Sequence, residues 1–318
     1  MAELECISKR RIRNATLALL LWPGIALAGE GGGSHYVPGT QNEFLLGVFG
    51  PAGFYLRNDV WSYDYNVGAH VRNGVAVGEA SQKVTLNTTK LSWLTDYEIL
   101  GGRYGASLAL TYALDADISG TVVTGPNGFT RGTSISGFSD AFVAPLLLNW
   151  AGEKQHFTFK LAAYAPTGTF DANNALNTSR NYWTGEIGGS YTYFDPQTGF
   201  EVSANAGYLS NQRNSDTGYR SGDEVHLDWT VAQHFSKSFT AGLSGYFYSQ
   251  VEADNGTVFG PISASDIKAW SYGLGPVVQW NVPVGDKSIG IIAKALFDID
   301  ASNRLSGDLY MLSLTYAF

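Results

Sequence analysis

The sequence predicts an all-β protein, a closed antiparallel transmembrane β-barrel of 12 strands, with a short N-terminal segment for which a place inside the lumen is one of three alternatives. Three observations lead to this fold: side chains that alternate with period 2, short and long connections that alternate along the chain, and aromatic residues at both strand ends. The final stretch, YMLSLTYAF at 310–318, has an apolar or aromatic side chain at every second position. Such alternation gives a strand two unlike faces.

The first 28 residues predict a secretory signal peptide. A basic stretch between residues 9 and 13 precedes an apolar run from Ala15 to Ala28, which closes with Ala-Leu-Ala. This run is too short, and too interrupted by Pro and Gly, to span a membrane as a helix. The single cysteine, Cys6, precedes the run, so we reject lipidation and expect no disulfide in the mature chain.

Composition restricts the possible partners. The formal net charge is −8, and no basic cluster follows the predicted signal peptide, which argues against a nucleic-acid partner. No apolar run of 18 or more residues follows residue 28, which excludes helical membrane spans. The 38 glycines and the 14% of aromatic residues suit an exported all-β protein, but they do not separate a soluble protein from a membrane protein.

Twelve segments have strand character. Their approximate ranges are 53–66, 83–100, 103–117, 138–150, 155–167, 181–195, 199–211, 218–235, 238–252, 267–283, 287–300 and 303–318. Every second connection is short and rich in Gly, Asp or Pro, which is typical of antiparallel hairpins. Most of the others are longer, among them 67–82, 118–137 and 168–180. This is the layout of an outer-membrane barrel with tight periplasmic turns and longer outer loops, and it predicts that both termini are periplasmic.

Aromatic residues decide which way the apolar face turns. One set precedes the short turns and a second set lies near the long connections: Trp150, Tyr193, Phe235 and Trp280, then Trp61, Trp183, Trp270 and Tyr248. Two rings of aromatic side chains are expected at the two membrane interfaces. The alternative is a secreted β-sandwich with ordinary buried aromatic residues. We favour an apolar face in contact with lipid.

The chain therefore divides into a signal peptide (1–28), an N-terminal segment (29–52) and the barrel (53–318). The apolar side chains of the N-terminal segment are too few to span lipid. The segment is either a periplasmic tail, a short strand extension, or a plug in the lumen. The residues that would form the plug are Phe44, Leu45, Leu46, Val48 and Phe49.

Strand parity also predicts which side chains line the lumen. These residues occupy the polar or small positions of the alternating segments: Lys160, Tyr164, Ser203, Asn205, His226, Asp228, Ser244, Tyr246, Tyr248, Ser271 and Lys294. Small, aromatic and weakly polar side chains of this kind are typical of a passive channel.

The residues that could carry chemistry are few. His234 and Ser236 lie two apart, as in an outer-membrane phospholipase, and parity turns both inward, but a polar strand end is the simpler interpretation. His226 and Asp228 could form a pair, yet no nucleophile or third ligand accompanies them. We therefore predict no catalytic residues, no metal and no cofactor.

Residues 165–229, which begin APTGTFDANN and end EVHLDW, resemble an outer-membrane channel family linked to the meta-pathway of phenol degradation. GSHYVPGT, GPAGFYLRN, LTDYEILGGRYG and GYFYSQ are also similar to that family, so the resemblance covers essentially the whole mature chain. It implies a twelve-stranded barrel and a narrow, largely uncharged channel for small hydrophobic molecules. The chain departs from the family at VFGPAG, where a more proline-rich stretch is usual, and at charged residues on predicted lumen faces.

We predict an outer-membrane passive channel of a Gram-negative bacterium for small hydrophobic, aromatic molecules, and not an enzyme. A general diffusion porin and a barrel enzyme of the lipase or phospholipase type are the alternatives. The expected partners are membrane lipid and lipopolysaccharide, a small hydrophobic substrate, and the barrel-assembly machinery, which would recognise the C-terminal Phe318.

Overall fold

The computed structural model describes residues 30, 33–67, 70–72, 75–124, 128–174, 176–259, 262–263, 268–285, 287–304 and 306–318. The predicted signal peptide lies outside these residues. Twelve long strands follow one another along the described chain: β1 (Gly53–Val67), β3 (Val75–Ile99), β4 (Gly102–Thr124), β6 (Ala141–Ala151), β7 (Gln155–Ala165), β8 (Thr184–Asp195), β9 (Phe200–Asn211), β10 (Glu224–His234), β11 (Phe239–Gln250), β14 (Trp270–Val284), β15 (Lys287–Ser302) and β16 (Ser306–Ala317). Three short strands accompany them, β2 (His70–Arg72), β12 (Thr257–Phe259) and β13 (Ile262–Ser263), together with the 11-residue strand β5 (Gly128–Phe138), which pairs with β4.

The twelve long strands close into one antiparallel barrel. β1 pairs with β3 on one side and with β16 on the other, and the pairing of β3 with β4 continues the sheet around to β6. At the seam, Tyr55 lies opposite Ala317, and the Phe318 amide donates a 2.9 Å hydrogen bond to the Phe54 carbonyl. Closure satisfies backbone groups that lipid cannot. The predicted fold, and the pairing of the last strand with the first, are confirmed.

The apolar face of each strand is the outer face. Leu227 on β10 and Leu243 on β11 are each 41% exposed, whereas their strand neighbours Asp228 and Ser244 are fully buried inside. Alternation in the sequence is therefore alternation between the outside of the barrel and its interior. Among the described residues, no helix is long and apolar enough to cross a membrane.

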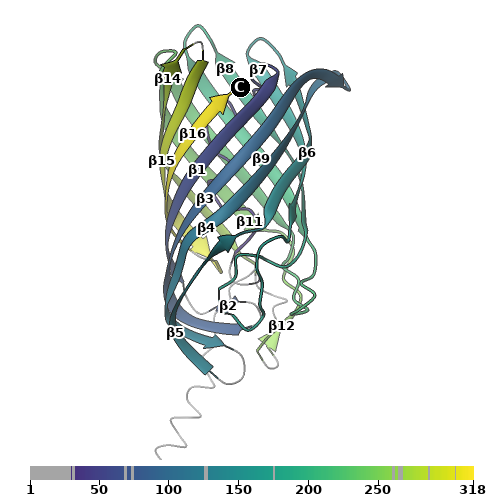
Figure 1. Cartoon of the computed structure of the whole chain (residues 1–318), viewed down its shortest axis with the longest axis vertical. Helices are drawn as coiled ribbons and strands as arrows, with labels where there is room; N and C mark the ends of the chain where they lie inside the picture. Colours follow the sequence, from purple (N-terminus) through teal and green to yellow (C-terminus); the bar gives the residue numbers. More distant parts are fainter. Residues whose placement is uncertain are drawn as a thin grey trace, which may run out of the picture.

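The two ends of the barrel differ as the connection lengths predict. Figure 1 shows the C-terminus at the end with the short turns, and β2, β5 and β12 at the opposite end. Two predicted loops, 67–82 and 118–137, are wrong in part, because much of each is strand. β3 already begins at Val75, β4 continues to Thr124, and β5 pairs back on β4. The β-branched residues of these stretches suit a sheet that extends past the barrel rim.

The two aromatic sets are only partly on the outer face. Trp183 and Trp280 are exposed there, at opposite ends of the barrel. The prediction is wrong for Trp61 and Tyr248, which are buried inside, because Val60 and Phe247 hold the outward positions beside them. The alternation of side chains along the strand decides whether an aromatic residue lies on the outer or the inner face. Its distance from a loop does not decide this.

Candidate functional site

The N-terminal segment crosses the barrel interior. At the end with the long connections, the Glu30 amide donates a 3.0 Å hydrogen bond to the Ser221 hydroxyl, between β9 and β10. At the end with the short turns, the Gly47 amide donates to the Thr192 hydroxyl at 2.8 Å, and β1 begins at Gly53. The described chain thus enters at the end opposite Phe318. The expectation that both termini share one end is wrong for this starting point.

Buried ionic groups fix the first part of this segment, around Tyr36, to the barrel wall. The Tyr36 hydroxyl donates a 2.9 Å hydrogen bond to Asp228, and the Tyr36 ring stacks on His226 with centroids 4.0 Å apart. His226 also contacts Asp228 at 2.8 Å and Glu186 at 3.2 Å, and Glu186 pairs with Lys160 at 2.5 Å. Charges are tolerated inside a protein only with partners, and each of these groups has one.

A lysine three strands from β10 holds the middle of the segment. The ammonium of Lys294 on β15 donates to the Gly39 carbonyl at 2.7 Å and to the Asn42 side-chain oxygen at 2.6 Å. It also lies 5.5 Å from the centre of the Trp61 ring. Asn42 in turn donates from its side-chain amide to the Gly245 carbonyl on β11 at 2.9 Å. These bonds fix the segment on the side of β11 and β15.

The five apolar residues predicted to form a plug lie inside the barrel, in two groups. The Leu45 amide donates to Glu201 at 2.5 Å, and the Phe44 ring meets His234 edge-on with centroids 6.1 Å apart. The other group lines an open space beside the segment, and it consists of Leu46, Val48 and Phe49. Within the second group, Gly47 leaves no room for a side chain, because a Cβ there would lie 2.7 Å from the His156 carbonyl oxygen.

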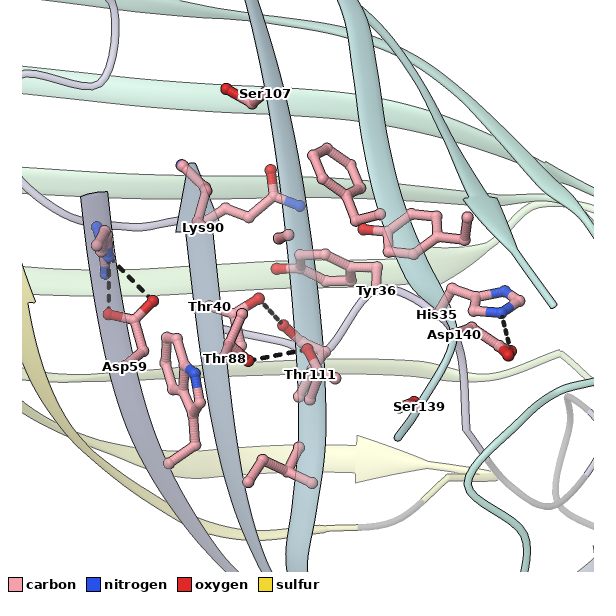
Figure 2. A pocket seen from close by; sticks show the side chains of 18 of the residues that line it. His35, Tyr36, Thr40, Asp59, Thr88, Lys90, Ser107, Thr111, Ser139 and Asp140 are labelled. Carbon is pink, nitrogen blue, oxygen red and sulfur yellow. Dashed lines mark hydrogen bonds and ion pairs between the residues drawn. The ribbon is translucent and has the colours of Figure 1, made fainter. Parts of the chain in front are cut away.

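A cavity of about 690 Å³ occupies the part of the lumen that the segment leaves free. Side chains of β1, β3, β4, β6 and β7 form much of its wall, and the N-terminal segment contributes to the rest (Figure 2). On β1 the lining runs from Tyr55 to Tyr65, ten residues that cover about 33 Å at ~3.3 Å per residue. Because Tyr55 is near the short turns and Tyr65 near the long connections, the cavity follows the barrel over most of its length.

Much of the cavity wall is apolar, with small hydroxyl groups and several charged side chains between the apolar residues. Its apolar members include Val37, Leu46, Phe49, Val84, Leu86, Leu94, Ala109, Ala113, Phe142 and Leu147. Thr88 and Thr111 face each other across β3 and β4 with their hydroxyls 2.9 Å apart, so these groups are satisfied within the wall. Arg57 is held at 2.7 Å by Asp59 and also pairs with Glu43. The apolar side chains between these groups give an aromatic molecule a surface to pack against.

The predicted lumen residues all lie on the inner face, but they belong to two environments. Three of them line the cavity: Lys160, Tyr164 and Asn205. The remainder are buried on the wall outside the cavity lining: Ser203, His226, Asp228, Ser244, Tyr246, Tyr248, Ser271 and Lys294. Sequence reasoning missed the cavity residues of β1, β3 and β4. For β1 a signal existed, because Arg57, Asp59, Trp61, Tyr63 and Tyr65 alternate strictly.

The phospholipase-like pair does not form. The His234 imidazole binds Glu201 at 2.6 Å and the Thr240 hydroxyl at 3.0 Å. β10 ends at His234, so Ser236 lies exposed in the following turn, where its hydroxyl contacts that of Ser238. The expectation that Ser236 points into the lumen is therefore wrong. Within the described ranges, no group of three or more His, Cys, Asp or Glu side chains is arranged to hold a metal ion.

The comparisons with known proteins agree with this architecture. Residues 71–314 match the family described as "Putative MetA-pathway of phenol degradation", which covers well over half of the chain. The chain belongs to this family. No curated protein matches the chain. A solved outer membrane channel from Pseudomonas putida F1 is 13% identical, with 89% of this chain and 100% of that chain covered at a TM-score of 0.66.

Two other solved structures are more distant. A FadL homologue from Pseudomonas aeruginosa is 11% identical, with 93% of this chain and 99% of that chain covered at a TM-score of 0.41. The NanC porin is 13% identical, with 82% and 100% covered at a TM-score of 0.42. The chain is an outer-membrane β-barrel, as predicted, and it shares the fold of the Pseudomonas putida channel.

Proposed function

We propose that this barrel is a passive channel through which small hydrophobic, aromatic molecules cross the outer membrane. The observation that carries the proposal is the 690 Å³ cavity, which runs beside the N-terminal segment between the two ends of the barrel. A barrel of this size leaves a modest passage, smaller than that of sixteen-stranded porins. The segment narrows it further.

The apolar part of the wall favours small aromatic molecules over hydrated inorganic ions and sugars. A sugar or hydrated ion loses hydrogen bonds to water in a narrow passage, and each unreplaced one costs about 1–3 kcal/mol. A monoaromatic molecule loses little, because about 25 cal/mol is gained for each Å² of apolar surface removed from water. Val37, Leu86, Ala109 and Phe142 provide such a surface.

Planar-bilayer recordings and cellular uptake test the proposal together. The purified intact protein should conduct ions only slightly, because the N-terminal segment occupies part of the lumen. Cells that carry the protein should take up a labelled neutral monoaromatic compound faster than matched cells without it. A large, unselective conductance with unchanged aromatic uptake would make the protein a general diffusion porin instead.

A further inference from the structure

The cavity wall is positively charged although the chain as a whole is acidic. The lining includes five cationic side chains, Arg57, Lys90, Lys160, Arg180 and Arg304, and three carboxylates, Glu43, Asp59 and Asp140. The formal net charge of the whole chain is −8. The lining of the passage therefore has a net positive charge, whereas the chain as a whole has a net negative charge.

Two of these cations, and all three carboxylates, are already paired. Arg57 pairs with both Glu43 and Asp59, and Lys160 pairs with Glu186 at 2.5 Å. Asp140 is bound by the His35 ring, whose Nε2 lies 2.9 Å from a carboxylate oxygen. The carboxylates that line the passage therefore have few free oxygen atoms with which to bind a cation.

The other three cations have no carboxylate within ion-pair distance among the described residues. Arg180 donates to two backbone carbonyls, those of Glu30 at 2.8 Å and Ser34 at 3.3 Å. Lys90 makes no hydrogen bond or ion pair to any described residue, and Figure 2 shows it among the side chains of the cavity. Neither group has the acidic partner that a purely structural cation usually has.

Of these three cations, Arg304 is the one best placed to bind an anion. Its guanidinium lies over the Tyr248 ring, 4.0 Å from the centre, and one terminal nitrogen, Nη1, is buried without a hydrogen-bond partner. Asp298 and Glu224 are near enough to act on it electrostatically but do not pair with it. A buried guanidinium N–H without an acceptor is costly, and a carboxylate is its best partner.

The unpaired cations lie at different depths with aromatic rings between them. Lys90 is opposite Arg57 in the sheet, while Arg304 lies by Tyr63 and Tyr65 at the end with the long connections. Tyr65 is eight residues beyond Arg57, which corresponds to about 26 Å at ~3.3 Å per residue. The rings of Trp61 and Tyr63 line the interval on β1.

We propose that the passage selects small aromatic acids in their anionic form, with Arg304 as the first carboxylate contact and Lys90 as the second. This inference rests on the proposed channel function and names its substrate class. Unpaired lysine and arginine side chains in a narrow pore favour anions and repel cations. The aromatic rings between the two contacts suit the apolar body of the same molecule.

Reversal potentials in planar bilayers test the selection directly. Gradients of potassium benzoate and of benzylammonium chloride compare an anion and a cation that share one ring. We expect benzoate to permeate at least about fivefold better than potassium, and benzylammonium to permeate worse than chloride. Lys90→Gln should bring the benzoate ratio toward 1, and Lys90→Glu should reverse the preference. Arg304→Gln should lower the same ratio.

Lys83→Gln is the matched control. Lys83 lies on the same strand, is 72% exposed, and pairs with Asp64 at 3.3 Å, so its loss removes one charge away from the passage. Retained heat-modifiable migration in gels shows that each variant is folded. Lys90 has no bonded partner to lose, so its variants should fold normally.

The outcomes separate this inference from the proposed function. A benzoate ratio near 1 that no Lys90 or Arg304 variant alters would overturn the inference. The channel function would stand if cells that carry the protein still take up a neutral monoaromatic compound faster than cells without it. Benzoate selection without any neutral uptake would support the inference and overturn the broader function. If the passage does not select benzoate and the protein does not speed the uptake of the neutral compound, both the inference and the proposed function are rejected.

Discussion

The Tyr36 hydroxyl lies 2.9 Å from a carboxylate oxygen of Asp228, inside the barrel, and joins the N-terminal segment to β10. The two residues are separated by 192 positions in the sequence. Asp228 is also bound by His226, on which the Tyr36 ring stacks. The segment is therefore anchored by ionic and aromatic contacts, in addition to the apolar contacts of Phe44–Phe49.

Replacement of Tyr36 by Phe should weaken this anchor without removing the stacked ring. The variant leaves Asp228 with one donor fewer, which should lower the free energy of unfolding by about 1–3 kcal/mol. Urea unfolding of the refolded barrel in lipid vesicles measures the loss. Tyr97→Phe is the control, because Tyr97 is 68% exposed beside a short turn. Equal effects of the two variants would mean that the Asp228 bond does not hold the segment.

His35 should make the anchor sensitive to pH. Burial lowers the pKa of His35 below its ordinary value of 6.5, and this outweighs the opposing effect of Asp140. Burial would raise the pKa of Asp140, but the hydrogen bond and charge of His35 bring it below its ordinary value. The unfolded chain therefore binds the His35 proton more tightly, so stability is complete above pH 6.5 and declines as the pH falls below that value.

The measurement is the unfolding free energy at pH 7.5 and pH 5 for the wild type and for His35→Gln. The wild type should lose more stability on acidification than the variant, because other titrating groups contribute to both proteins alike. A larger loss in His35→Gln than in the wild type would contradict the assigned direction.

The outer face should reject charge much more strongly than the cavity face. Leu110 on β4 is 45% exposed on the outside, and its neighbour Thr111 lines the cavity. Leu110→Arg should cost about 2–4 kcal/mol near the membrane midplane. Thr111→Arg should cost about 1 kcal/mol, the usual value of its one lost hydrogen bond to Thr88. Unfolding in vesicles compares them, and similar costs would show that the faces are assigned wrongly.

Removal of residues 34–50 should open the lumen. The deletion takes away the hydrogen-bond partners of Lys294 and the Tyr36 partner of Asp228, and it leaves both side chains facing a water-filled pore. We expect ion conductance in planar bilayers to rise several-fold toward that of an open barrel. Tyr36→Ala, which keeps the segment, should instead give brief opening events. An unchanged conductance after the deletion would show that the segment does not restrict the passage.

The sequence was sufficient for the barrel because alternation and connection length are local properties of the chain. Leu227 and Asp228 differ in environment for the simple reason that they are neighbours on a strand. The division of the lumen into a cavity and a region filled by the N-terminal segment could not be predicted from the sequence. Lys160 and Lys294 have the same inward parity, yet one lines a cavity and the other holds Gly39, because the path of the N-terminal segment depends on contacts across nearly the whole chain.

Obstruction of the cavity by a single side chain tests the central claim most directly. Ala109 on β4 lies opposite Lys90 in the sheet and is buried on the cavity wall. Ala206 on β9 is exposed on the outer face, so a ring placed there meets lipid. Uptake of a labelled neutral monoaromatic compound is measured in cells that carry equal amounts of the wild type, Ala109→Trp or Ala206→Trp. Ala109→Trp should reduce uptake to the level of cells without the protein, and Ala206→Trp should match the wild type. Undiminished uptake through folded Ala109→Trp would contradict passage through this cavity.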